Sequence, residues 1–224
     1  MKSATSFRHV GQYEAHDLLR LRALPAADDM PTWLRHAFAQ CPFAVVRRAE
    51  APSGFVAVGF RGADRAQRYG AFAPSESVEL VLRPAQLRDR PVSSDRINLK
   101  AFAAFRALVE DAHFDTLAWG PTGSVGFELA TMRQTVTEAS DLDIVIRAPA
   151  PLARERARAL RERATRIERT FDVRIDAQLE TPAGGVALSE WAASKPRVLA
   201  RSAGGPRMTA DPWRDDGAAR EDSR

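Results

Sequence analysis

The chain has 224 residues, 45% hydrophobic and 28% charged, which is enough for one large or two small globular domains. It has no apolar run of about 18 residues and no apolar segment at its start, so we expect neither a membrane span nor a signal peptide, and we predict a cytoplasmic location. A net charge of +4 and a pI of about 9.8 favour polyanionic or acidic partners, although a GC-rich coding bias would also enrich arginine.

Cysteine and histidine usage argues against disulfides and zinc. Cys41 is the single cysteine and has the apolar neighbours Pro42 and Phe43, so we predict a buried structural thiol. Zinc-ligand spacing is absent from the four histidines, which are His9, His16, His36 and His113.

Residues 1–95 are predicted to form a small α+β domain. Two segments have the spacing of amphipathic helices, and Pro31 suits the first turn of the second, where its missing N–H costs nothing. Three further segments are rich in Val, Phe and Leu and are separated by Pro, Gly and Ser, as strands are. The predicted helices span 14–23 and 31–40, and the predicted strands span 43–48, 54–60 and 78–83.

Three arginines lie between the second and third of these strands. Arg61, Arg65 and Arg68 recur at spacings of four and three, which on a helical turn places them on one face. Guanidinium groups suit the phosphates of a substrate or the surface of an acidic carrier protein, but a solvated charged face has the same pattern.

The segment 90–95 contains proline and two serines, and we place the domain boundary there. Strands and helices alternate after it, which predicts a layered α/β catalytic domain over 96–210. The charged segment 211–224 has Trp213 as its only large apolar residue, and we expect a flexible tail. The predicted elements are helices 98–113, 124–132, 151–169 and 188–193, and strands 116–119, 141–146, 173–180 and 197–200.

Two aspartates open the strand 141–146. Asp141 and Asp143 are two residues apart, so on a strand both point to the same face of the sheet. Like carboxylates this close repel each other, and Mg²⁺ binds one or two carboxylates together with substrate phosphates. The pair therefore predicts a magnesium site, although a helix cap and a surface salt bridge would use the same residues.

A glycine turn precedes these aspartates. The run Gly120-Pro-Thr-Gly-Ser-Val-Gly stands between a predicted strand and a predicted helix, where free N–H groups at the helix start bind phosphate. Gly123 and Ser124 are the candidate triphosphate-binding residues. The spacing fits neither a Rossmann fingerprint nor a Walker A loop.

Gly123-Ser124 at a helix start, followed by an Asp-x-Asp strand, resembles the polymerase-β-like nucleotidyltransferase superfamily. The resemblance implies a mixed sheet with flanking helices and a third carboxylate on a later strand. Asp176 in the strand 173–180 is the candidate, with Asp172 and Glu180 as competitors.

A longer sequence motif resembles one particular family more specifically than the superfamily. The run from Gly120 to Thr131, followed by Ser140-Asp-Leu-Asp, resembles the malonate decarboxylase holo-acyl-carrier-protein synthases, which are phosphoribosyl-dephospho-CoA transferases. Segments 42–48 and 58–68 extend the resemblance over most of residues 30–205.

This resemblance implies transfer of the 2'-(5-triphosphoribosyl)-3'-dephospho-CoA group to a serine of the malonate decarboxylase acyl-carrier subunit, with release of diphosphate. Mg²⁺ on Asp141 and Asp143 would assist the transfer, and Asp176 would complete the metal site or accept the serine proton. Lys195, together with the three arginines, is a candidate for substrate phosphates or for the carrier.

Other functions remain open at this stage. A nucleotidyltransferase that modifies a protein or an RNA with an ordinary nucleoside triphosphate would need the same aspartates. A basic module that binds nucleic acid is less favoured, because the chain has neither an aromatic-rich RNA-binding strand nor a known DNA-binding motif. A pseudoenzyme of the same fold would retain the pattern without catalysing the reaction.

Overall fold

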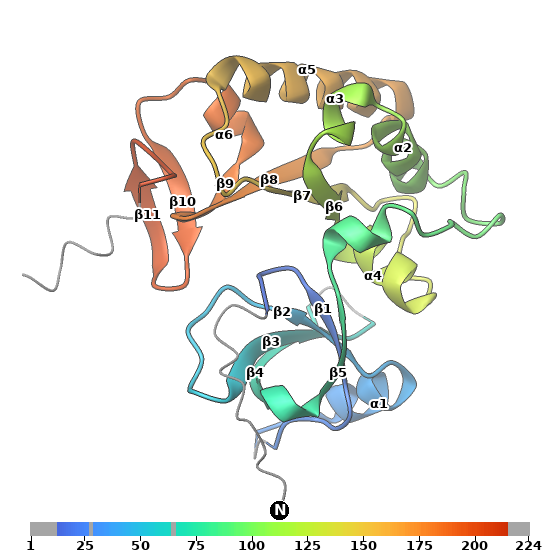
Figure 1. Ribbon diagram of the computed structural model, residues 1–224. Helices are drawn as coiled ribbons and strands as arrows, with labels where there is room; N and C mark the ends of the chain where they lie inside the picture. The colour runs from blue at the N-terminus through green and yellow to red at the C-terminus, as the bar shows by residue number, and fades with distance from the viewer. Residues whose placement is uncertain (1–12, 27–28, 64–65, 215–224) are drawn as a thin grey trace, which may run out of the picture. The chain divides into compact units, whose positions relative to one another are not determined.

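The computed structural model describes residues 13–26, 29–63 and 66–214. The chain divides into two compact units, Met1–Leu82 and Arg83–Arg224, so the division falls before the segment 90–95. Each unit contains a sheet and helices (Figure 1), and the predicted α+β class is confirmed. Within the described residues, no helix is long and apolar enough to cross a membrane.

The N-terminal unit is built on an antiparallel sheet of five strands in the order β4-β3-β2-β1-β5. Helix α1 (Thr32–Gln40) begins after Pro31, as predicted. A short 3-10 helix, Ser75–Ser77, precedes the last strand. The strands are β1 (Leu18–Leu21), β2 (Phe43–Val46), β3 (Phe55–Arg61), β4 (Arg68–Pro74) and β5 (Val78–Leu82).

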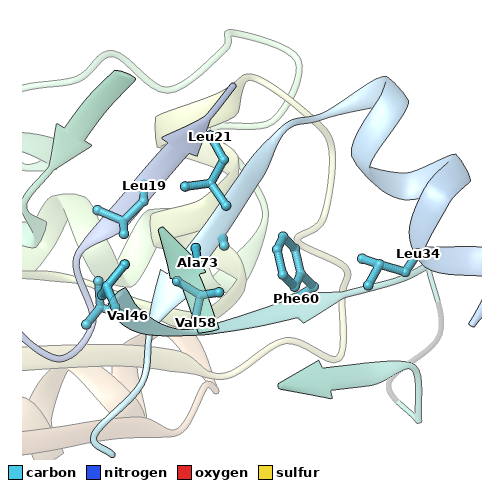
Figure 2. Packing of buried hydrophobic residues seen from close by; sticks show 9 residues of the cluster. Leu19, Leu21, Leu34, Val46, Val58, Phe60 and Ala73 are labelled. Atoms are coloured by element: carbon cyan, nitrogen blue, oxygen red, sulfur yellow. The ribbon is translucent and has the colours of Figure 1, made fainter. Parts of the chain in front are cut away.

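The core of this unit lies on one face of the sheet (Figure 2). Alternate residues Val56, Val58 and Phe60 of β3 are buried there, because successive side chains of a strand point to opposite faces. Leu34 of α1 packs into the same cluster. The helix is therefore held against the sheet by burial of apolar surface.

The predicted helix 14–23 is wrong. Residues Leu18–Leu21 form β1, which pairs with both β2 and β5. The turn before it is closed by Asp17, whose buried carboxylate accepts a hydrogen bond from the Glu14 N–H at 3.0 Å. Pairing on both edges outweighs the weak helical preference of so short a segment.

The predicted helical turn carrying three arginines is also wrong. Arg61 ends β3 and Arg68 begins β4, and the two residues lie directly opposite each other in an antiparallel hairpin. The third, Arg65, lies outside the described residues. Cys41, expected to be buried, is only half-buried, because it lies in the connection between α1 and β2.

The C-terminal unit contains a mixed sheet of six strands in the order β11-β10-β9-β8-β7-β6. Strands β7 and β8 are parallel, and the other neighbours are antiparallel. A short 3-10 helix, Pro84–Leu87, opens the unit. The strands are β6 (Ala118–Pro121), β7 (Leu142–Arg147), β8 (Ile175–Thr181), β9 (Gly184–Ala187), β10 (Val198–Ser202) and β11 (Gly205–Thr209).

Helices lie on both faces of this sheet (Figure 1), as the predicted layers require. Leu142, Ile144 and Ile146 of β7 are almost fully buried on the face covered by α2 and α5, and α4 lies on the other face. The helices are α2 (Lys100–Val109), α3 (Ala112–Asp115), α4 (Gly123–Thr131), α5 (Arg154–Phe171) and α6 (Leu188–Ala192).

The long helix predicted over 98–113 is divided in two. The first part, α2, ends at Val109, and Asp111 caps α3 by accepting a hydrogen bond from the His113 N–H at 2.9 Å. Its carboxylate also accepts from Arg163 Nε on α5 at 2.7 Å. An aspartate that caps the next helix and pairs with a third element therefore interrupts a continuous apolar stripe.

The start of the predicted flexible tail is ordered. Trp213 packs edge-on against Trp191 with ring centroids 4.9 Å apart, and its indole N–H donates to the Ala148 carbonyl at 2.8 Å. Arg154 lies over the other ring system, with its guanidinium carbon 3.2 Å from the Trp191 centroid. Residues 211–214 are held by this packing and by hydrogen bonds such as that from the Ala183 N–H to the Pro212 carbonyl at 3.0 Å, and residues 215–224 lie outside the described part.

Candidate active site

The glycine turn joins β6 to α4 and lies against β7. The Thr122 N–H donates to the Asp143 carbonyl at 2.8 Å, which ties the turn to the neighbouring strand. Gly123 has a φ of +57°, and a Cβ built there would lie 2.9 Å from Cγ of Asp143. Glycine is required at this position both by its backbone conformation and by the close approach of the carboxylate.

The N-terminus of α4 lies beside the carboxylate of Asp143. The N-cap residue Thr122 makes no side-chain hydrogen bond to the first turn, which begins at Gly123. Ser124 is the second residue of the helix and is half-buried. Free N–H groups and the positive end of the helix dipole favour an anion such as a phosphate.

Carboxylates from two parallel strands lie beside this turn. Asp143 of β7 and Asp176 of β8 are register partners, and paired residues of neighbouring strands project from the same face. Asp141 is exposed and precedes β7, so the strand does not fix its direction as the sequence suggested. The predicted closeness of Asp143 to the glycine turn is confirmed.

Arg174 is a residue of this site that the sequence analysis did not identify. Its Nη2 atom lies 2.7 Å from both carboxylate oxygens of Asp176. This hydrogen bond raises the pKa of Arg174, and the charges of Asp176, Asp141 and Asp143 raise it further. One guanidinium therefore interacts electrostatically with all three predicted catalytic carboxylates. The sequence offered no signal for it, because a single basic residue before a strand indicates no particular partner.

A buried ion pair organises the loop between α4 and β7. Glu128 of α4 pairs with Arg96, whose Nε donates to Oε1 at 2.9 Å. The other oxygen of Glu128 accepts from the Thr135 and Val136 N–H groups at 2.7 and 2.8 Å. These bonds hold the long connection between Ser124 and the aspartates against the helix.

The competing carboxylates belong to other networks. Asp172 caps the end of α5 and pairs with Lys100 at 2.5 Å. Glu180 accepts a hydrogen bond from Gln178 Nε2, four residues beyond Asp176 and about 13 Å further along the strand. Position alone therefore favours Asp176 as the partner of Asp143.

Lys195, another predicted binding residue, precedes a different strand of the same sheet. Lys195 is exposed in the loop before β10, where its carbonyl accepts from Arg154 Nη2 at 3.1 Å. Strand β10 is two strands away from β8 in the sheet. Arg61 and Arg68 belong to the N-terminal unit.

The donor set fits a magnesium ion in its chemistry. Mg²⁺ keeps several waters and needs only one or two carboxylates in addition to substrate phosphates, and Asp143 is in place beside the turn. Throughout the described ranges, no group of three or more His, Cys, Asp or Glu side chains is arranged to hold a metal ion. At Asp176, both carboxylate oxygens accept from Arg174.

Carboxylates on parallel strands next to a glycine turn at a helix N-terminus are typical of enzymes that bind phosphate groups. Residues 86–212 match the family model described as the phosphoribosyl-dephospho-CoA transferase MdcG C-terminal domain, and residues 14–84 match that of the N-terminal domain. The chain belongs to the phosphoribosyl-dephospho-CoA transferase family and is therefore a transferase.

Curated relatives with that name align over most of their length. The protein of Pseudomonas putida (strain W619) is 43% identical over 203 residues, which is 89% of this chain and 95% of the relative. That of Azotobacter vinelandii is 39% identical over 209 residues, 90% of this chain and 95% of the relative. The protein of Pseudomonas aeruginosa is 41% identical over 206 residues, which is 90% of this chain and 94% of the relative. No solved structure matches the chain significantly.

Proposed function

We propose that the protein transfers the 2'-(5-triphosphoribosyl)-3'-dephospho-CoA group to a serine of the malonate decarboxylase acyl-carrier subunit, releasing diphosphate. The observation that carries the proposal is the packing of the Asp143 carboxylate against Gly123, with Asp176 beside it on the next strand. Membership of the family supports the choice of a dephospho-CoA derivative over an ordinary nucleoside triphosphate.

The reaction forms a bond between the serine hydroxyl oxygen and the α-phosphorus of the triphosphate. The bond from that phosphorus to the bridging oxygen breaks, diphosphate leaves, and the serine loses its proton. The barrier lies mainly in positioning and in the charge on the phosphoryl oxygens. Mg²⁺ held by Asp141 and Asp143 would neutralise part of that charge.

Different groups of the chain would bind the phosphates, hold the metal and accept the proton. The N–H groups at the start of α4 and the Ser124 hydroxyl would bind the β and γ phosphates. Asp176 would complete the metal site or accept the serine proton. Arg61, Arg65, Arg68 and Lys195 remain candidates for distal phosphates or for the acidic surface of a carrier.

The test is mass spectrometry of the purified apo-carrier subunit after incubation with the protein, Mg²⁺ and the triphosphoribosyl substrate. A mass gain equal to the prosthetic group, with no gain when ATP replaces the substrate, is the expected result. A gain only with ATP would establish the nucleotidyltransferase alternative, and no gain with either would overturn the proposal.

The variant Asp143→Asn is expected to lower the rate of this mass gain at least about a hundredfold, because one electrostatic component of a phosphoryl-transfer site has that effect. Asp89→Asn is the matched control, since Asp89 is an exposed carboxylate close to the start of the same unit. An equal rate in both variants would contradict the role given to Asp143.

A further inference from the structure

Arg174 places a positive charge beside the predicted catalytic carboxylates. Three carboxylates at one edge of a sheet repel one another unless a positive charge lies between them. In this structure the guanidinium of Arg174 supplies that charge, with Nη2 at 2.7 Å from each oxygen of Asp176. The same guanidinium also interacts with the charges of Asp141 and Asp143.

The Arg174 backbone is fixed while its side chain is not enclosed. Its carbonyl accepts a hydrogen bond from the Leu142 N–H at 2.9 Å, which holds this residue beside the start of β7. The side chain is 65% exposed and that of Asp176 is 50% exposed. An exposed ion pair is weak, so the guanidinium can leave the carboxylate at small cost in free energy.

Both oxygens of Asp176 are occupied while this pair is formed. A hard divalent ion binds through the same oxygens, and it would be repelled by a guanidinium beside them. Arg174 and a divalent ion therefore compete for Asp176.

We propose that Arg174 serves as the internal counter-ion of these carboxylates, holding Asp176 in place until a divalent ion displaces the guanidinium from it. Arg174 is thus a positioning residue that sets how tightly the site binds its metal. The inference rests on the proposed function only in that it takes Asp141 and Asp143 to bind a divalent ion.

The experiment is a titration of the full-length protein with Mn²⁺, followed by electron paramagnetic resonance at low ionic strength and without any CoA derivative. Arg174→Gln is expected to bind Mn²⁺ about three- to fivefold more tightly than the wild type, the range set by an exposed ion pair. Arg174→Lys retains the charge and is expected to stay closer to the wild type. The gain should shrink in high salt, which screens exposed charges.

Two controls separate competition from a general effect of charge. Arg158→Gln removes another exposed arginine, which pairs with Glu155 on α5, and it should leave Mn²⁺ affinity unchanged. In an Asp176→Asn background, Arg174→Gln should give a clearly smaller gain than in the wild type, because the two residues act as a coupled pair.

The inference is overturned if Arg174→Gln binds Mn²⁺ no more tightly than the wild type, or if Arg158→Gln gives the same gain. Because no substrate or carrier is present, this outcome is independent of whether the prosthetic group is transferred. Carrier modification without any change in Mn²⁺ affinity would leave the proposed function intact and reject the role of Arg174 alone.

Discussion

Replacing Gly123 by alanine tests the packing on which the site depends. Two effects combine in Gly123→Ala, namely an L-residue at a φ of +57° and a Cβ only 2.9 Å from Cγ of Asp143. The backbone effect alone costs about 1–2 kcal/mol. The crowding must be relieved by moving the carboxylate, and a displacement of about 1 Å near reacting groups lowers turnover roughly a hundredfold.

Gly54→Ala separates the two effects. Gly54 has a φ of +82°, but a Cβ there meets nothing within 4 Å, so this variant carries the backbone strain without the crowding. Thermal unfolding should show a comparable loss of stability in both variants. Only Gly123→Ala should lose activity in the carrier-modification assay, and turnover within about twofold of the wild type would refute the argument.

Three further outcomes concern stability and are measured by urea unfolding. Glu128→Ala should lower the free energy of unfolding by about 2 kcal/mol, because it removes the carboxylate partner of a half-buried guanidinium and the acceptor of two N–H groups. Trp213→Ala should cost about 2 kcal/mol through the lost packing on Trp191. Burial raises the pKa of Asp111, but its hydrogen bonds and Arg163 outweigh that effect and hold the pKa below its ordinary value. The stability this carboxylate contributes should be present above about pH 4 and lost as the pH falls through the lowered pKa, and Asp111→Asn should flatten that dependence.

Much of the C-terminal unit could be predicted because its elements are long and strongly patterned. The apolar stripe of α2 and the alternating residues 173–180 both have a clear period, and glycines mark the start of α4. The association of the aspartates with the glycine turn was implied by the resemblance to the nucleotidyltransferases.

The errors arose where distant contacts decide local structure. Four residues at Leu18–Leu21 become a central strand because β2 and β5 pair with them, and no local pattern reports those partners. Strands β9 and β11 are short and contain glycine, so their sequences do not show the alternation of apolar and polar residues that predicts a strand. Arg174 has a function only through its contacts with neighbouring carboxylates, and a single basic residue before a strand carries no signal of that kind.

The two connections of β7 differ in how freely their lengths can change. The loop before it is mostly exposed over residues 133–139, so engineered insertions there should be accommodated while the Glu128 contacts hold its base. The connection after it is α5, eighteen residues and roughly 27 Å long, which leads directly to the parallel neighbour β8. One residue added within that helix would rotate everything beyond it by about 100°, so tags and reporter fusions belong in the loop and not in the helix.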